Sequence, residues 1–202
     1  SVISNWYKDL AIPMAREDYN IEKVFNEIFQ NNLVLSDKEK AEKIYNYLCE
    51  NISYSSVSFR QSNFVPQKPM VTISTKLGDC KDLSVLYYTL AKKAGLKTNL
   101  VLVSTIDNGV NSLKIPSTNF NHCIVRIEVD NDTLFQELTD SKLPFGSLPN
   151  HIANAQALVI YEEESENNAS SLIHIPEHKW INNSIDRSVI LTVNDDVINI
   201  KT

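Results

Sequence analysis

The sequence predicts an α+β domain in which helices come first and an antiparallel sheet follows. Two observations carry this prediction. Before residue 95, apolar residues recur at the three-to-four-residue spacing of amphipathic helices. After residue 98 they fall in short alternating or continuous runs separated by turn residues, which are typical of strands. The length of 202 residues and a hydrophobic share of 43% are sufficient for one globular domain with its own core.

Two helices are expected before residue 52. The first has apolar residues at the spacing i, i+3, i+4, i+7 and i+8, namely Ile21, Val24, Phe25, Ile28 and Phe29. The second begins at Ser36, because Ser36 and Glu39 form a capping box in which each side chain satisfies an unpaired backbone N–H. Residues 1–19 are interpreted as a lead-in segment. Residues 52–77, which contain two prolines, are interpreted as a long extended loop of the kind that tends to be functional.

A third helix is expected from Cys80 to Ala94, and Gly95 follows it where a left-handed residue commonly ends a helix. Strands are then expected over 99–104, 120–129, 133–139, 157–161, 172–175 and 188–193. The second strand alternates, with His122 and Cys123 on opposite faces, and a turn at 130–132 joins it to the third. We expect residues 1–160 to form the core with its lead-in, and residues 161–202 to add strands that begin a following β-rich domain.

The composition excludes several classes of protein. The formal net charge is −6 and no basic face stands out, so nucleic acid is not an expected partner. No stretch reaches the roughly 20 apolar residues of a membrane span, and the first residues lack the features of a signal peptide. Three cysteines are too few and too irregular for a disulfide framework or a zinc site. Because the chain starts without Met and ends in a strand-like run, we interpret it as a piece of a longer or processed protein.

The segment Gly78-Asp79-Cys80-Lys81-Asp82 lies where a loop becomes a buried helix. A cysteine at a helix N-terminus faces unpaired N–H groups and the positive end of the helix dipole, and both favour the nucleophilic thiolate. The glycine would let a substrate backbone approach closely. The alternative is that Cys80 is a buried first-turn residue and that Gly-Asp forms only a turn and a cap. This segment alone does not separate the two hypotheses.

His122 favours the first hypothesis, because a cysteine nucleophile requires a general base. A third group should orient the imidazole, and the returning strand carries two acids, Glu137 and Asp140. A three-residue turn at 130–132 would set Asp140 directly across from His122. A longer loop or a bulge would make Glu137 the partner instead.

These segments resemble the bacterial transglutaminase-like superfamily. The resemblance rests on Gly-Asp-Cys-Lys-Asp before an apolar helix, on Phe-Asn-His at 120–122, and on Phe-Gln-Glu-Leu-Thr-Asp at 135–140 followed by Leu-Pro-Phe-Gly. The helix ending in Glu-Asn-Ile-Ser-Tyr at 50–54 is similar to the family's approach to the site. The likeness runs from about residue 20 to 150. It implies a papain-like transglutaminase core, with Cys on the central helix and His and the acid on neighbouring antiparallel strands.

The resemblance implies roles for individual residues. Cys80 matches the family's nucleophile and His122 its base. The third residue is usually Asp in an Asp-x-Thr context, and this chain has Glu137 there, one methylene longer, with Asp140 as the alternative third member. An oxyanion hole would use the backbone N–H of Cys80 and a second donor. Gln61 is a candidate by analogy with papain-like enzymes, unless it is only an exposed polar loop residue.

The expected chemistry is acyl transfer through a thioester on protein or peptide amides. Release of the acyl group by water would make the protein a cysteine protease or amidase, and release by an amine would make it a transglutaminase. No metal or organic cofactor is required. The competing hypothesis is a catalytically inert binding or scaffold domain, which the Glu in place of Asp favours. Related bacterial cores are often flanked by β domains and exported, so a periplasmic or cell-envelope location is compatible with the resemblance.

Overall fold

The computed structural model describes residues 2–30, 34–56, 64–109, 119–130, 132–162, 172–177, 188–194 and 197–201. The helices are α1 (Val2–Ala11), η1 (Ile12–Met14), α2 (Tyr19–Phe29), α3 (Asp37–Asn51), α4 (Pro69–Thr75), α5 (Cys80–Lys93) and η2 (Ile106–Asn108). The strands are β1 (Ser53–Tyr54), β2 (Leu77–Gly78), β3 (Lys97–Ser104), β4 (His122–Val129), β5 (Asp132–Gln136), β6 (Gln156–Ile160), β7 (Leu172–His174), β8 (Ile190–Asn194) and β9 (Val197–Lys201).

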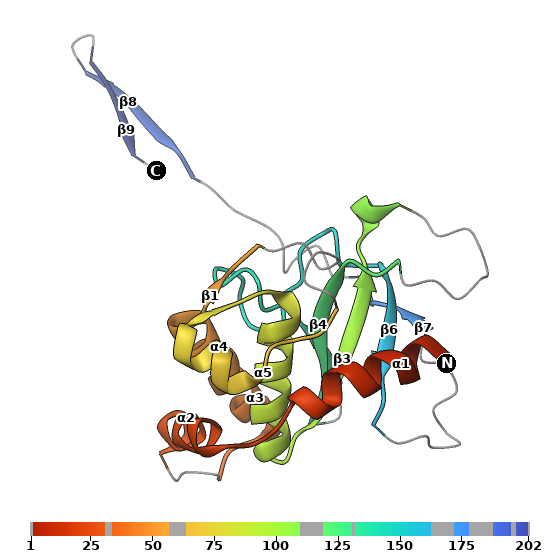
Figure 1. Cartoon of the computed structure of the whole chain (residues 1–202). Helices are drawn as coiled ribbons and strands as arrows, with labels where there is room; N and C mark the ends of the chain where they lie inside the picture. Colours follow the sequence, from red (N-terminus) through yellow and green to blue (C-terminus); the bar gives the residue numbers. More distant parts are fainter. Residues whose placement is uncertain are drawn as a thin grey trace.

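Helices α1 to α5 gather on one side of an antiparallel sheet of order β5-β4-β3-β6-β7, which confirms the predicted α+β class (Figure 1). The central helix α5 packs against β3 and β4 and is buried along most of its length. The helix-facing side of the sheet contributes Leu100, Leu102, Cys123, Val125 and Ile127 to the main core. The opposite side forms a smaller core in which Val101, Val103 and Ile124 pack against Leu148, Ile152 and Ile175.

The sequence signals for the expected helices correspond to real contacts. The Ser36 hydroxyl accepts the N–H of Glu39, and the Glu39 carboxylate accepts the N–H of Ser36 at 2.8 Å, so α3 begins with the predicted capping box. Helix α5 ends as expected at Gly95, which has a φ of +81°. The N–H of Gly95 bonds to Lys92 O and the N–H of Leu96 to Ala91 O, which is the Schellman arrangement. No described helix is both long and apolar enough to cross a membrane.

Two helices lie in segments where none was expected. The lead-in contains α1, which buries Ser4, Tyr7 and Ala11. The segment interpreted as an extended loop contains α4, which begins at Pro69. A proline in the first turn is compatible with a helix because its missing N–H would have no partner there anyway. The loop interpretation was therefore wrong for residues 69–75.

The sheet also continues beyond the expected core boundary at residue 160. Strand β7 pairs with β6, and Ile175 is buried in the smaller core, so residues 172–175 extend the main sheet and its packing. Strands β8 and β9 pair with each other in a separate two-stranded sheet.

The β4–β5 hairpin has a shorter turn than expected. Val129 pairs directly with Asp132, so two residues rather than three separate the paired positions, and Asp130 has a positive φ of 50°. The three-residue turn that would have set Asp140 across from His122 was therefore wrong. Strand β5 ends at Gln136, and the chain leaves the ladder at the next residue.

Candidate active site

Cys80 is the first residue of α5 and is 3% exposed. Asp79 is the N-cap, and its side chain accepts the N–H groups of Lys81 at 3.1 Å and Asp82 at 3.2 Å. In return, the Asp82 carboxylate accepts the N–H of Asp79 at 3.0 Å. Asp79 and Asp82 thus form a capping box, which fixes the backbone on either side of the thiol.

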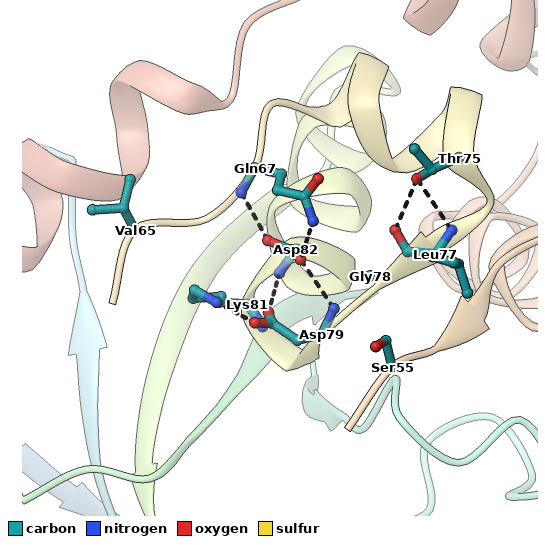
Figure 2. Close-up of a pocket in the computed structure, with 9 residues that line it drawn as sticks. All are labelled: Ser55, Val65, Gln67, Thr75, Leu77, Gly78, Asp79, Lys81 and Asp82. Atoms are coloured by element: carbon teal, nitrogen blue, oxygen red, sulfur yellow. Dashed lines mark hydrogen bonds and ion pairs between the residues drawn. The ribbon is translucent and has the colours of Figure 1, made fainter. Parts of the chain in front are cut away.

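Gly78 is required by packing around this turn. A Cβ at this position would lie 3.0 Å from Asp82 Cβ and 3.1 Å from Thr72 Cγ2. Asp82 is also held from outside the helix, because its carboxylate accepts the backbone N–H of Gln67 at 2.7 Å and the Gln67 amide at 2.8 Å (Figure 2). The glycine therefore accommodates the close approach of α4 and α5, and the expected role in admitting a substrate backbone is not needed to explain it.

A cleft of about 330 Å³ opens beside the first turn of α5 (Figure 2). Its lining consists of Ser55, Val65, Gln67, Thr75, Leu77, Gly78, Asp79, Lys81 and Asp82. Lys81 is 1% exposed and forms an ion pair with Asp79 at the base of this cleft. The lining includes Asp79 and Lys81, the residues on either side of Cys80, but not Cys80 itself.

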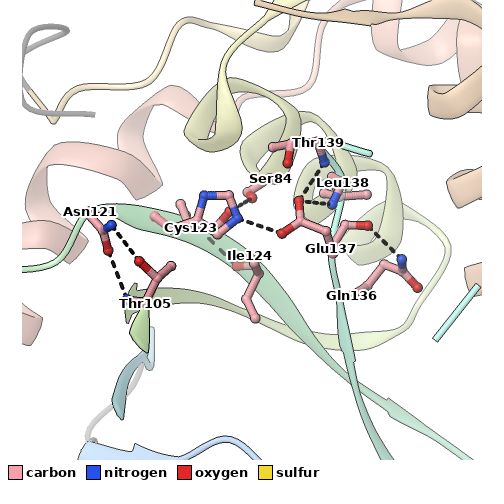
Figure 3. A network of polar contacts seen from close by, with 10 residues as sticks. Ser84, Thr105, Asn121, Cys123, Ile124, Gln136, Glu137, Leu138 and Thr139 are labelled. Carbon is pink, nitrogen blue, oxygen red and sulfur yellow. Dashed lines mark hydrogen bonds and ion pairs between the residues drawn. The ribbon is translucent and has the colours of Figure 1, made fainter. Parts of the chain in front are cut away.

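His122 opens β4 and lies close to both other members of the expected set. Its Nε2 lies 2.6 Å from Glu137 Oε2, and its ring is near enough to the Cys80 side chain for the two groups to shift each other's pKa. Because Nε2 is taken by the carboxylate, Nδ1 is the nitrogen that remains for the thiol. Glu137 is itself fixed, since its Oε1 accepts the N–H groups of Leu138 at 2.7 Å and Thr139 at 2.6 Å (Figure 3).

Burial and neighbouring charges set the protonation of these groups. Burial lowers the pKa of His122, but the Glu137 carboxylate and Cys80 outweigh it and raise that pKa to about 10. Burial raises the pKa of Glu137, but His122 and the hydrogen bonds of its own loop lower it to about 2. Burial likewise raises the pKa of the Cys80 thiol, and the hydrogen bond and charge of His122 offset this only in part. At neutral pH the resting site therefore holds an imidazolium, a carboxylate and a thiol, although the helix N-terminus alone led us to expect a thiolate.

The structure separates Asp140 from the imidazole. Asp140 is exposed, and its side chain accepts the N–H of Lys142 at 3.0 Å. Gln61, the candidate second oxyanion donor, lies outside the described residues. Among the other cysteines, Cys49 is half-buried and Cys123 is fully buried in the helix-side core, as expected for packing residues. The described residues contain no group of three or more His, Cys, Asp or Glu side chains that could hold a metal ion.

Tyr54 lies near the site, and the sequence pointed to it only as the last residue of the segment 50–54 that resembles the family's approach to the site. It pairs with Gly78 in the parallel β1–β2 ladder, two residues before Cys80. Burial, followed by the charges of Cys80 and Glu137, raises the pKa of its phenol to about 12, so the phenol is neutral at physiological pH. Two-residue strands that pair in parallel leave no alternating pattern, so hydrophobic periodicity carries no signal for this neighbour.

Comparisons with known proteins identify the family and the fold of the chain. A family model described as the transglutaminase-like superfamily matches residues 27–135. The crystal structure of a "putative protease" from Parabacteroides distasonis superposes with a TM-score of 0.57 at 10% identity, over 79% of this chain and 28% of that chain. A "putative cysteine protease" from Cytophaga hutchinsonii gives a TM-score of 0.44 at 13% identity, over 81% of this chain and 61% of that chain. The chain thus spans less than two thirds of either protein, and the first likeness is one of fold. No curated protein matches the chain significantly.

Proposed function

Because this chain belongs to the transglutaminase-like superfamily, we propose that it is a cysteine-dependent acyltransferase that acts on protein or peptide amides through a thioester. The observation that carries the proposal is the arrangement of Cys80, His122 and Glu137, in which a buried carboxylate binds the imidazole at 2.6 Å and the thiol at the start of α5 lies close to the same ring. Nucleophile, base and orienting acid are the components that such chemistry requires.

The reaction begins when the resting site loses one proton to solvent, which leaves a Cys80 thiolate beside the His122 imidazolium. The thiolate attacks the amide carbonyl carbon and the carbonyl π bond opens to an oxyanion. When the oxyanion collapses, the C–N bond breaks and His122 transfers its proton to the departing nitrogen. Neutral His122 then takes a proton from water or from an amine, which attacks the thioester and displaces Cys80 as thiolate. Glu137 stays ionised throughout and stabilises the imidazolium.

One observation favours an alternative, a non-catalytic domain of the same fold. The Cys80 side chain is only 3% exposed, and its burial opposes formation of the thiolate. In such a protein the three side chains would serve as a buried polar network rather than as a reactive centre.

Incubation of the protein with casein and the fluorescent amine dansylcadaverine separates the proposed acyltransferase from the non-catalytic alternative. Casein fragments indicate a protease, fluorescent casein indicates a transglutaminase, and both should disappear in Cys80→Ala. Thermal unfolding of Cys80→Ala serves as the control for folding. If 4-nitrophenyl acetate, a far more reactive acyl donor, also leaves Cys80 without an acyl group, the non-catalytic alternative stands.

We also propose that the hairpin β8–β9 begins a following β-rich domain. Among the described strands, β8 and β9 pair only with each other, and an isolated two-stranded hairpin is marginally stable in water. Amide hydrogen exchange that is fast in β8 and β9 but slow in β3 and β4 would support this proposal. Fast exchange would mean that the hairpin is unstable without the further strands against which it is proposed to pack. Equal protection in both sheets would contradict it.

A further inference from the structure

We propose that the outer edge of β1 binds the main chain of an extended peptide next to the reacting amide, with Tyr54 as the residue that pairs with it. The proposal rests on the proposed function and adds how its substrate is held. It concerns the backbone of residue 54, which contributes no reacting atom, so Tyr54 is a substrate-positioning residue.

The hydrogen bonds of β1 define which peptide groups are available. The N–H of Ser53 bonds to Lys76 O at 2.9 Å, and the N–H of Ser55 bonds to Gly78 O at 2.8 Å. Peptide groups of successive residues in a strand point to opposite sides. Since residues 53 and 55 face β2, the N–H and C=O of Tyr54 face away from it.

This outer edge is open among the described residues. Strand β1 pairs with β2 alone, and both Ser53 and Tyr54 are exposed, Tyr54 by 41%. Proteins commonly block a free edge with lysine, proline or a bulge. Here the edge carries only serines around Tyr54, so nothing on it opposes the addition of another strand.

The position of this edge selects the occupant. Tyr54 is in register with Gly78, and β2 runs on directly into Cys80. The Tyr54 phenol is close enough to Cys80, Glu137 and Asp79 to respond to their charges. A strand added to β1 therefore pairs with the residue whose phenol lies near the nucleophile, and the proposed reaction acts on amides that have main chain on either side. One residue that presents both its N–H and its C=O can bind such a chain by strand addition.

The variant Tyr54→Pro tests this directly. Proline removes the outward N–H of residue 54, whereas the N–H groups of Ser53 and Ser55 that hold β1 to β2 remain. Tyr54→Ala is the matched control, because it loses the phenol and keeps the N–H. The probe is a tryptic digest of casein, added as a competitor while iodoacetamide alkylates Cys80, with the alkylated fraction measured by peptide mass spectrometry.

We expect the digest to protect Cys80 in the wild type and in Tyr54→Ala. In Tyr54→Pro the half-protecting concentration should rise about 3- to 10-fold over that of Tyr54→Ala, the loss expected for one hydrogen bond. Absence of protection in the wild type, or equal protection in the two variants, would overturn the proposal. So would a dimer in light scattering that the digest does not dissociate, because a second copy would then occupy the edge.

A measurement on the wild type covers the case in which Tyr54→Pro does not fold. The amide hydrogen of Tyr54 should exchange rapidly with solvent in the free protein and more slowly with the digest present, and an unchanged rate would contradict the proposal. The result is independent of turnover. If the digest protects the Tyr54 amide while Cys80 forms no acyl adduct with any donor, the peptide site stands and the proposed function fails.

Discussion

Glu137 Oε2 lies 2.6 Å from His122 Nε2, while Glu137 Oε1 accepts two N–H groups from its own loop, those of Leu138 and Thr139. The extra methylene of Glu relative to Asp thus lets one carboxylate hold both the imidazole and the backbone that follows it. The carboxylate is 1% exposed, so protein groups rather than solvent fix its orientation. Glu in the position usually held by Asp is therefore compatible with an orienting role.

We expect Glu137→Gln to lower acyl transfer by about two to four orders of magnitude, because an amide leaves the imidazolium without its counter-charge. Glu137→Asp is the matched control, since it keeps the charge and shortens the side chain. It should retain more activity than Glu137→Gln but less than the wild type, because one carboxylate can no longer reach both Nε2 and the loop. The measurement is kcat/KM with a fixed acyl donor. Equal activity of Glu137→Gln and the wild type would exclude Glu137 from the site.

The rate of acyl transfer should depend on pH as a bell with its maximum on the alkaline side of neutrality. The acid limb follows ionisation of Cys80, whose pKa burial raises above the ordinary thiol value of 9.0. The alkaline limb follows loss of the His122 proton at a pKa of about 10. Single-turnover acylation by a peptide 4-nitroanilide across this range gives the profile, because its departing nitrogen needs the proton of His122. A maximum near pH 6 would contradict the protonation states described for the resting site.

The same two groups should shape the stability of the fold. The pKa of His122 is raised from 6.5 to about 10, so its stabilisation is complete below pH 6.5 and is lost as the pH rises through 10. The pKa of Glu137 is lowered from 4.5 to about 2, so its stabilisation is complete above pH 4.5 and is lost as the pH falls through 2. The free energy of unfolding in urea should therefore be highest between these windows. In His122→Gln the alkaline decline should be smaller, and an unchanged decline would assign it to other groups.

Gly78→Ala should destabilise the protein by about 1–3 kcal/mol, because the new Cβ meets Asp82 and Thr72 at close range. Thr72→Ser removes the Cγ2 methyl that would lie 3.1 Å away, so the double variant should recover part of the loss. Urea unfolding of the two single variants and the double variant measures the coupling. Strictly additive effects would show that Thr72 does not limit the space at Gly78.

The periodic parts of the sequence predicted their structure well. Helices α2, α3 and α5 carry apolar residues at helical spacing, and their caps involve neighbours along the chain, so both signals are local. Helix α1 buries Ser4, Tyr7 and Ala11, which have helical spacing, but Ser and Ala are only weakly apolar and the periodicity is faint. Helix α4 was not predicted because the prolines of residues 52–77 were interpreted as evidence of an extended loop. In the structure Pro69 is the first residue of that helix.

The sequence identified the residue types of the candidate site, but it did not predict the pKa values of their side chains. The order of Cys80, His122 and Glu137 along the chain could be read directly, because each opens or follows a recognisable element. The choice between Glu137 and Asp140 depended on a turn one residue shorter than expected, which the sequence Asp-Asn-Asp does not specify. The raised pKa of Cys80 could not be predicted, because it comes from burial by segments distant in the sequence.

The central claim is that Cys80 and His122 act as one nucleophilic unit, and the pH dependence of Cys80 alkylation by iodoacetamide tests it most directly. Peptide mass spectrometry isolates Cys80 from Cys49 and Cys123 without further substitutions. Since the hydrogen bond and charge of His122 lower the pKa of the thiol against the effect of burial, the wild type should alkylate at lower pH than His122→Ala and faster at every pH below the plateau. Superimposed profiles for the two proteins would contradict the claim, because Cys80 would then ionise without any help from His122.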